Sequence, residues 1–244
     1  ITLLIEDITQ KKKLQEQLAE YEKLSALSQL ALGAAHEINN PLQGISSYLE
    51  ILKEKLHQQT EKEELDLVIS NVYRISETIR GLLNFARPSP PQFTKINLNS
   101  LIEDTLSFLR HQPIFRKINI QKNLSSSLPL ISADLNQIRQ VLINIIINAA
   151  QAMPNEGDLI VKTSKLKFKE WISIEISDTG IGIPPDQLKK IFHPFFTTKK
   201  KEGTGLGLSI SLSYIRNHKG DIMIKSKVGV GTTVTILLPI RQKK

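Results

Sequence analysis

The chain has 244 residues, of which 40% are hydrophobic and 23% are charged, a balance typical of folded globular proteins. It has no cysteine, which excludes disulfides, thiolate metal sites, iron–sulfur clusters and a cysteine nucleophile. The net charge is +8, but the basic residues are scattered and only 5% of residues are aromatic. Because a base-stacking surface needs aromatic side chains among basic ones, we expect no nucleic-acid partner. A polyanionic ligand such as a nucleotide explains part of this charge equally well.

Residues 1–9 alternate like a strand but have no partner strand nearby, so we interpret them as the end of an upstream domain. A strand, then Asp-Ile-Thr, then a charged helix resembles the exit of a PAS sensor domain. Glu6 and Asp7 interrupt the apolar stretch, so no signal peptide is predicted. No apolar run approaches the roughly 18 residues that cross a bilayer. We therefore expect this part of the protein to be cytoplasmic, with any membrane anchor upstream.

Two long amphipathic helices are predicted over residues 10–57 and 61–86. In the first helix, apolar residues recur three or four positions apart at Ala34, Ile38, Leu42, Ile45, Leu49, Leu52 and Leu56. The stripe of the second helix is Leu65, Val68, Ile69, Val72, Ile75, Ile79, Leu82 and Leu83. Two such helices form a hairpin, and two hairpins close a four-helix bundle. We therefore predict that residues 10–86 form an all-α hairpin that dimerises. Three prolines within residues 87–95 make a semi-rigid linker to the next domain.

Residues 96–244 mix helices and strands without regular βαβ alternation, which favours an α+β two-layer sandwich over a Rossmann fold. The predicted helices are 98–109, 134–152 and 209–217, and the predicted strands are 118–124, 158–167, 171–177, 221–225 and 232–238. Gly220 is expected to stop the last helix, and a turn at Gly229 and Gly231 joins the last two strands.

His36 lies off the apolar stripe of the first helix, beside Glu37, and Asn40 follows one turn later on the same face. Pro41 inside the helix is costly because it removes a hydrogen bond, so a local bend is expected. A neutral imidazole can act as a nucleophile when an acid accepts the proton of its other nitrogen. The alternative is an ordinary surface histidine. A zinc protease motif is excluded, because it needs a second His where Asn40 stands.

Asn144 and Asn148 share one face of an otherwise apolar helix, where unsatisfied amides are costly. Their oxygens could hold Mg²⁺, which takes few protein ligands together with substrate phosphates. Core hydrogen bonds are the alternative.

Two glycine-containing turns complete the candidate residues. Asp178 follows a strand and precedes Gly180 and Gly182, so its carboxylate could accept a hydrogen bond from an amino group such as that of adenine. A plain turn is the alternative. The segment 203–207, Gly-Thr-Gly-Leu-Gly, opens a helix and could bind phosphates through its N–H groups. The preceding segment 195–201 places two Phe before three Lys, which favours a lid.

In this order, the motifs resemble the cytoplasmic core of a sensor histidine kinase, over roughly residues 10 to 240. The segments that match its H, N, G1, F and G2 boxes are 36–42, 144–152, 178–183, 192–196 and 203–208. The residues around the H and N boxes are similar to the nitrogen-regulatory NtrB-like branch. The resemblance implies a GHKL-type ATPase sandwich after a dimerising phosphotransfer hairpin.

The resemblance also implies roles. His36 would be the phosphoacceptor, Glu37 its base, and Asn40 would position a water that removes phosphate from the receiver domain of a response regulator. ATP and Mg²⁺ are the implied cofactors, with Asn148 and Asn144 as metal ligands. Asp178 would bind the adenine amino group. The other residues implied in ATP binding are Gly180, Gly182, Lys199, Gly203, Thr204, Gly205, Leu206 and Gly207.

Three alternatives stay open: a plain ATPase of the gyrase, Hsp90 and MutL group, a degenerate kinase that serves as a dimeric scaffold, and a protein that acts mainly as a phosphatase. The first is disfavoured because those ATPases carry a Glu that activates water one turn before the magnesium-binding Asn, where this chain has Asn144.

Overall fold

The computed structural model of the chain describes residues 38, 42–49, 51–53, 65, 68, 72, 75, 79, 90–166, 170–198 and 205–241. It divides into two compact units, Ile1–Ser89 and Pro90–Lys244. The predicted strand over residues 1–9 lies outside the described residues.

The described residues of the first unit are all helical. Leu42 from the first predicted helix packs with Val72 and Ile79 from the second in a small buried core, and Leu49 lies against it. The two helices of the hairpin therefore contact each other through one apolar row each.

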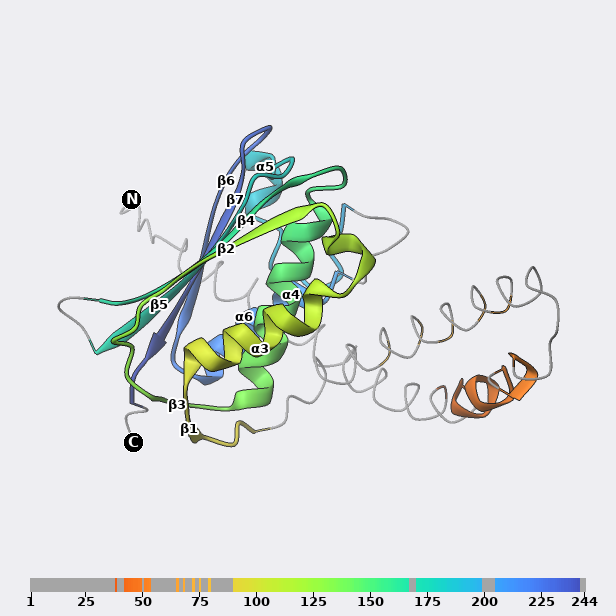
Figure 1. Cartoon of the computed structure of the whole chain (residues 1–244), viewed down its shortest axis with the longest axis horizontal. Helices are drawn as coiled ribbons and strands as arrows, with labels where there is room; N and C mark the ends of the chain where they lie inside the picture. Colours follow the sequence, from red (N-terminus) through yellow and green to blue (C-terminus); the bar gives the residue numbers. More distant parts are fainter. Residues whose placement is uncertain are drawn as a thin grey trace, which may run out of the picture. The chain divides into compact units, whose positions relative to one another are not determined.

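The second unit is built on a five-stranded mixed sheet with the strand order β2-β4-β5-β7-β6 (Figure 1). Its strands are β2 (Ile118–Leu124), β4 (Gly157–Lys165), β5 (Trp171–Asp178), β6 (Asp221–Lys227) and β7 (Gly231–Pro239). Only the β2–β4 pair is parallel. In β5 every second residue is buried, as expected for a sheet with one covered face.

Three helices cover that face of the sheet: α3 (Leu98–Arg110), α4 (Leu135–Gln151) and α6 (Gly207–Asn217) (Figure 1). The core between the two layers consists of fully buried aliphatic side chains such as Ile102, Leu142, Ile146, Leu159 and Ile174. The predicted α+β two-layer sandwich is confirmed.

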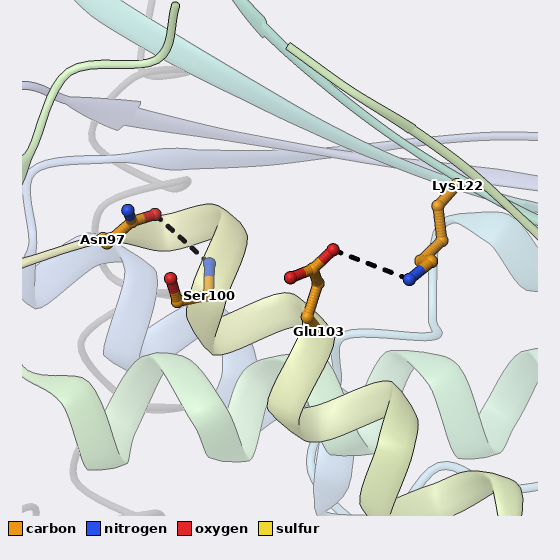
Figure 2. Close-up of polar contacts among 4 residues, drawn as sticks. All are labelled: Asn97, Ser100, Glu103 and Lys122. Atoms are coloured by element: carbon orange, nitrogen blue, oxygen red, sulfur yellow. Dashed lines mark hydrogen bonds and ion pairs between the residues drawn. The ribbon is translucent and has the colours of Figure 1, made fainter. Parts of the chain in front are cut away.

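Helix α3 begins where the Asn97 side chain accepts a hydrogen bond from the backbone N–H of Ser100, at 3.2 Å (Figure 2). On the exposed side of the same helix, Glu103 forms an ion pair of 3.6 Å with Lys122 of β2. Because both side chains are about half exposed, this pair contributes little stability, roughly 0–1 kcal/mol. Burial of the helix's apolar stripe therefore holds α3 on the sheet.

Helix α4 begins at a stronger cap. The Asp134 side chain accepts hydrogen bonds from the N–H groups of Asn136 and Gln137, at 2.9 and 3.0 Å. Its other oxygen accepts one from the N–H of Gln92, at 2.7 Å. Residue 134 therefore joins the start of α4 to residue 92, near the end of the predicted linker.

Four short elements are missing from the sequence-based prediction. Strands β1 (Thr94–Ile96) and β3 (Ile131–Ala133) form a separate antiparallel pair, and η1 (Pro113–Phe115) and α5 (Pro185–Leu188) are single turns. Elements of three or four residues are too short to show a periodic pattern of apolar residues, so contacts within the fold determine whether they form.

The end of α6 differs in detail from the prediction at Gly220. Lys219, with a φ of 55°, takes the left-handed position, and the N–H of Gly220 closes the helix on the carbonyl of Ile215 at 2.9 Å. A Cβ at Gly220 would lie 2.3 Å from the carbonyl oxygen of Leu237. The glycine is needed because β7 approaches it closely.

None of the helices among the described residues is both long enough and apolar enough to cross a membrane.

Candidate functional site

Asp178 ends β5 and closes the turn that follows it. Its Oδ1 accepts hydrogen bonds from the N–H groups of Gly180, at 2.9 Å, and of Thr232 in the neighbouring strand β7, at 3.2 Å. The side chain is 9% exposed. A carboxylate in this position is fixed by two strands and oriented by backbone donors before any ligand arrives.

The glycines around Asp178 are required by close backbone contacts. A Cβ at Gly180 would lie 2.6 Å from the carbonyl oxygen of Ala152, at the end of α4. Gly182 has a φ of 71°, and a Cβ there would lie 2.2 Å from the carbonyl oxygen of Lys227. The turn after Asp178 therefore packs closely against both the end of α4 and the β6–β7 hairpin.

Asn144 and Asn148 lie one turn apart on α4, as predicted, but their surroundings differ. The amide nitrogen of Asn144 donates to the carbonyl oxygen of Gly207, at 3.2 Å, and to the hydroxyl of Ser211, at 3.3 Å. Its oxygen accepts a bond of 3.2 Å from Gln140. Within the part of the chain that the structure describes, the half-buried side chain of Asn148 makes no hydrogen bond.

The end of the glycine-rich segment leads directly into α6. Gly205 has a φ of 69°, and a Cβ there would lie 2.4 Å from the backbone of Phe195, which itself has a φ of 65°. Leu206 is buried, and Gly207 is the first residue of α6. The structure thus brings the F-box segment and the end of the glycine-rich segment into contact.

Six predicted site residues lie outside the described residues: His36, Glu37, Asn40, Lys199, Gly203 and Thr204. The predictions for them therefore rest on the sequence.

Sequence reasoning missed several polar residues that organise the described site. Ser211 is fully buried and donates to the carbonyl of Gly207 at 2.8 Å. Thr232 is buried beside Asp178, and its hydroxyl is 2.9 Å from that of Ser226. The glycine turn before Thr232 was the only signal near it, and nothing in the spacing of α6 singles out Ser211 from its neighbouring serines.

His218, at the far end of α6, is a second residue that the sequence did not indicate. It is fully buried, its Nε2 accepts the N–H of Asp134 at 2.8 Å, and its Nδ1 donates to the carbonyl of Tyr214 at 2.7 Å. Burial lowers the pKa of His218, although the hydrogen bond to Tyr214 and the carboxylate of Asp134 act to raise it. A neutral imidazole therefore ties α6 to the start of α4.

Comparison with known proteins identifies both units. Residues 133–242 match the domain described as "Histidine kinase-, DNA gyrase B-, and HSP90-like ATPase", and residues 26–91 match the "His Kinase A (phospho-acceptor) domain". The chain belongs to the sensor histidine kinases. Both the fold and the order of the units agree with this family.

Among relatives of this histidine kinase chain, the signal transduction histidine-protein kinase AtoS of Escherichia coli K12 is 38% identical over 98% of the chain. The chain spans 39% of the length of AtoS. The crystal structure of the histidine kinase ThkA in complex with the response regulator protein TrrA matches with a TM-score of 0.66 and 27% identity, over 97% of this chain and 68% of that one. Full-length ShkA in complex with AMPPNP shares the fold, with a TM-score of 0.76 and 21% identity over 88% of this chain and 46% of ShkA.

Proposed function

We propose that this chain binds ATP in its second unit and transfers the γ-phosphoryl group to His36 in its first. The observation that carries the proposal is that α4, which bears Asn148, contacts both other parts of the predicted site. The turn after Asp178 packs against the end of α4 at Ala152, and Gly207 accepts a hydrogen bond from α4. The match of residues 133–242 to an ATPase domain and of residues 26–91 to a phosphoacceptor domain supports it.

Each step of this transfer is assigned to particular residues of the chain. Asp178 orients adenine by accepting from its amino group, and the segment 203–207 surrounds the phosphates with N–H groups. An imidazole nitrogen of His36 attacks the γ-phosphorus with its lone pair, while Glu37 accepts the proton from the other nitrogen. A nitrogen–phosphorus bond forms, the bond to the β–γ bridging oxygen breaks, and ADP leaves. Catalysis of this kind depends mainly on alignment and charge stabilisation.

Mg²⁺ fits the donors that α4 presents. The Asn148 amide is half-buried and makes no hydrogen bond within the described part of the chain, and amide oxygens are suitable ligands for this ion together with phosphates. We infer that Asn148 supplies the protein ligand. When bound, Mg²⁺ neutralises phosphate charge. The sequence also predicts Asn144 as a ligand, and Lys199 as a phosphate contact.

A response regulator is the proposed partner, because ThkA forms a complex with such a protein. The phosphoryl group of His36 would pass to an aspartate of its receiver domain. Asn40 would position the water that later removes it, which would make the chain a phosphatase as well.

The test is incubation with γ-labelled ATP and Mg²⁺, beside a His36→Gln variant. We expect a phosphoprotein that is stable to alkali, labile to acid and absent in the variant. Label that persists in the variant would place the nucleophile elsewhere, and ATP hydrolysis without any label would favour the plain ATPase.

Asn40→Ala separates the two proposed activities. It should remove phosphatase activity toward a phosphorylated receiver domain while autophosphorylation continues at the wild-type rate. Loss of both activities would contradict the role proposed for Asn40.

A further inference from the structure

The two asparagines of α4 differ in how many hydrogen bonds hold their side chains. Both hydrogens of the Asn144 amide nitrogen have acceptors, the Gly207 carbonyl and the Ser211 hydroxyl, and Gln140 donates to its oxygen. The Asn148 side chain makes no hydrogen bond with the described part of the chain. One amide is therefore already committed to protein partners, while the other can turn toward a ligand.

The orientation of the Asn144 amide follows from the chemistry of its partners. The carbonyl oxygen of Gly207 can only accept, so the amide nitrogen must face it. Ser211 gives its hydroxyl hydrogen to the same carbonyl at 2.8 Å, so its oxygen accepts from Asn144. Each donor in this triangle has one acceptor. A carboxylate at position 144 would place an oxygen against the Gly207 carbonyl, with no hydrogen between them.

This triangle lies where the glycine-rich segment becomes a helix. Gly207 is the first residue of α6 and comes directly after Gly205 and the buried Leu206. Ser211 is fully buried in the next turn. A bond from α4 to Gly207 therefore fixes the start of α6 against the face of α4 that carries Asn148 one turn later.

We propose that Asn144 is a positioning residue, which with Ser211 clamps the start of α6 onto α4, and that it leaves metal binding to Asn148, the ligand inferred above. The inference rests on the proposed function, because it concerns the residues that would hold ATP and Mg²⁺. It predicts that the clamp sets the affinity for the nucleotide itself, while Asn148 sets how much Mg²⁺ improves that affinity.

The experiment measures the dissociation constant of ATP by calorimetry on the full chain, once with Mg²⁺ and once with EDTA. Ser211→Ala, which removes one member of the triangle, should weaken binding about three- to tenfold in both conditions. Asn144→Asp should weaken it about tenfold or more in both, because two oxygens then face each other. In both variants the ratio of the two constants should stay at its wild-type value.

Two control variants separate this role from others. Asn148→Ala should bring the ratio close to one and leave the affinity in EDTA near that of the wild type. Ser209→Ala also removes a serine hydroxyl from the first turns of α6, but that hydroxyl donates to the carbonyl of Leu206 at 2.8 Å and makes no hydrogen bond to α4 among the described residues. Ser209→Ala should lose similar stability and keep its affinity for ATP. If Ser211→Ala weakened binding only by destabilising α6, Ser209→Ala would weaken it as well. The fluorescence of Trp171 establishes that each variant is folded during the assay.

Each outcome decides between the explanations. If Asn144→Asp changes the effect of Mg²⁺ but not the affinity in EDTA, Asn144 is a metal ligand and the positioning role is wrong. If Ser211→Ala and Ser209→Ala weaken binding equally, the clamp is not specific and the inference also fails. A wild-type chain that binds no ATP in either condition would overturn the proposed function, and this inference with it.

Discussion

At the scale of single residues, Asp178 is expected to determine which nucleobase the site binds. Its Oδ1 already accepts from the N–H groups of Gly180 and Thr232, and the role predicted for the carboxylate is to accept from the adenine amino group. Asp178→Asn keeps the shape of the side chain, and its amide oxygen can still accept from the two backbone N–H groups. The second carboxylate oxygen, however, is replaced by an NH₂ group, which can only donate. A lost hydrogen bond to a charged group corresponds to about 1.5–3 kcal/mol, so ATP should bind about 10- to 100-fold more weakly.

Inosine triphosphate, which has an oxygen in place of the amino group, provides the control for this prediction. The wild type should prefer ATP over inosine triphosphate by a similar factor, and Asp178→Asn should discriminate little between them. A variant that keeps the wild-type preference would show that another residue reads the base.

Gly231 illustrates how a glycine supports a site residue from outside the site. It has a φ of 130°, and a Cβ there would lie 1.9 Å from the carbonyl oxygen of Asp178. Gly231→Ala should therefore cost at least about 2 kcal/mol in the free energy of unfolding, because the backbone conformation is strained and β5 must move. Denaturant unfolding followed by the fluorescence of Trp171 in β5, the chain's one tryptophan, measures this cost.

Gly229→Ala is the matched control in the same turn. Gly229 has a φ of 73°, but nothing lies within 4 Å of an added Cβ. Only the left-handed conformation is then penalised, by about 1 kcal/mol. Equal costs at the two positions would mean that the contact with Asp178 does not matter.

At the scale of the elements, His218 and Asp134 join the end of α6 to the start of α4. Two residues near the end of the predicted linker add to this junction. Gln92 donates to the Asp134 carboxylate, and the Phe93 ring lies edge-on to the His218 ring with 5.2 Å between their centres. Burial would raise the pKa of Asp134, but the N–H groups of Gln137, Gln92 and Asn136 and the nearby His218 lower it overall. Burial in the same junction raises the pKa of Tyr214, with Asp134 adding to the effect.

The junction predicts how stability depends on pH. Burial holds the pKa of His218 below its ordinary 6.5, so the unfolded chain takes up a proton at higher pH than the folded chain does. The free energy of unfolding should therefore be highest above pH 6.5 and should fall below it, by at most about 1.4 kcal/mol per pH unit, until the lowered pKa is passed. The lowered pKa of Asp134 adds a separate loss only below its ordinary 3.8.

The measurement is denaturant unfolding between pH 5.0 and 7.5, followed by Trp171. His218→Gln should be less stable at neutral pH but should lack the loss below pH 6.5, because an amide oxygen can accept from Asp134 without titrating. A variant with the wild-type slope would assign the pH dependence to another group.

The elements also show what a sequence alone can predict. The predicted helix 134–152 agrees with α4 within one residue at each end, and the five predicted strands agree with β2, β4, β5, β6 and β7 within two residues, because these signals are local. The pairing of β1 with β3 is a tertiary contact between segments 37 residues apart, and no local pattern encodes it. The same limit applies within the site. The spacing of Asn144 and Asn148 placed both on one face, but only the fold shows that Gly207 and Ser211 lie against the first of them.

At the scale of the whole molecule, each helix of the hairpin carries two apolar rows with a spacing of seven residues. Leu42 and Leu49 on one helix, with Val72 and Ile79 on the other, face each other within the hairpin. The second rows, Ile38, Ile45 and Leu52 together with Val68 and Ile75, are each between 43% and 47% exposed in a single copy. An exposed apolar surface on both helices is expected where a second hairpin completes a four-helix bundle. The match to a phosphoacceptor domain agrees with a homodimer.

The exposed rows give the test of this dimer. Ile45→Asp places a charge in the second row of each copy and does not touch the core formed by Leu42, Val72 and Ile79. Two buried isoleucines are lost per dimer, at about 1.5–3 kcal/mol each, so dissociation should become at least a hundredfold easier, as measured by sedimentation over a range of concentrations. Ser47→Asp is the control, since residue 47 is exposed and belongs to neither row, and it should leave the dimer intact. If Ile45→Asp dissociates no more readily than Ser47→Asp, the second rows do not form the interface, and the dimer must be built on another surface.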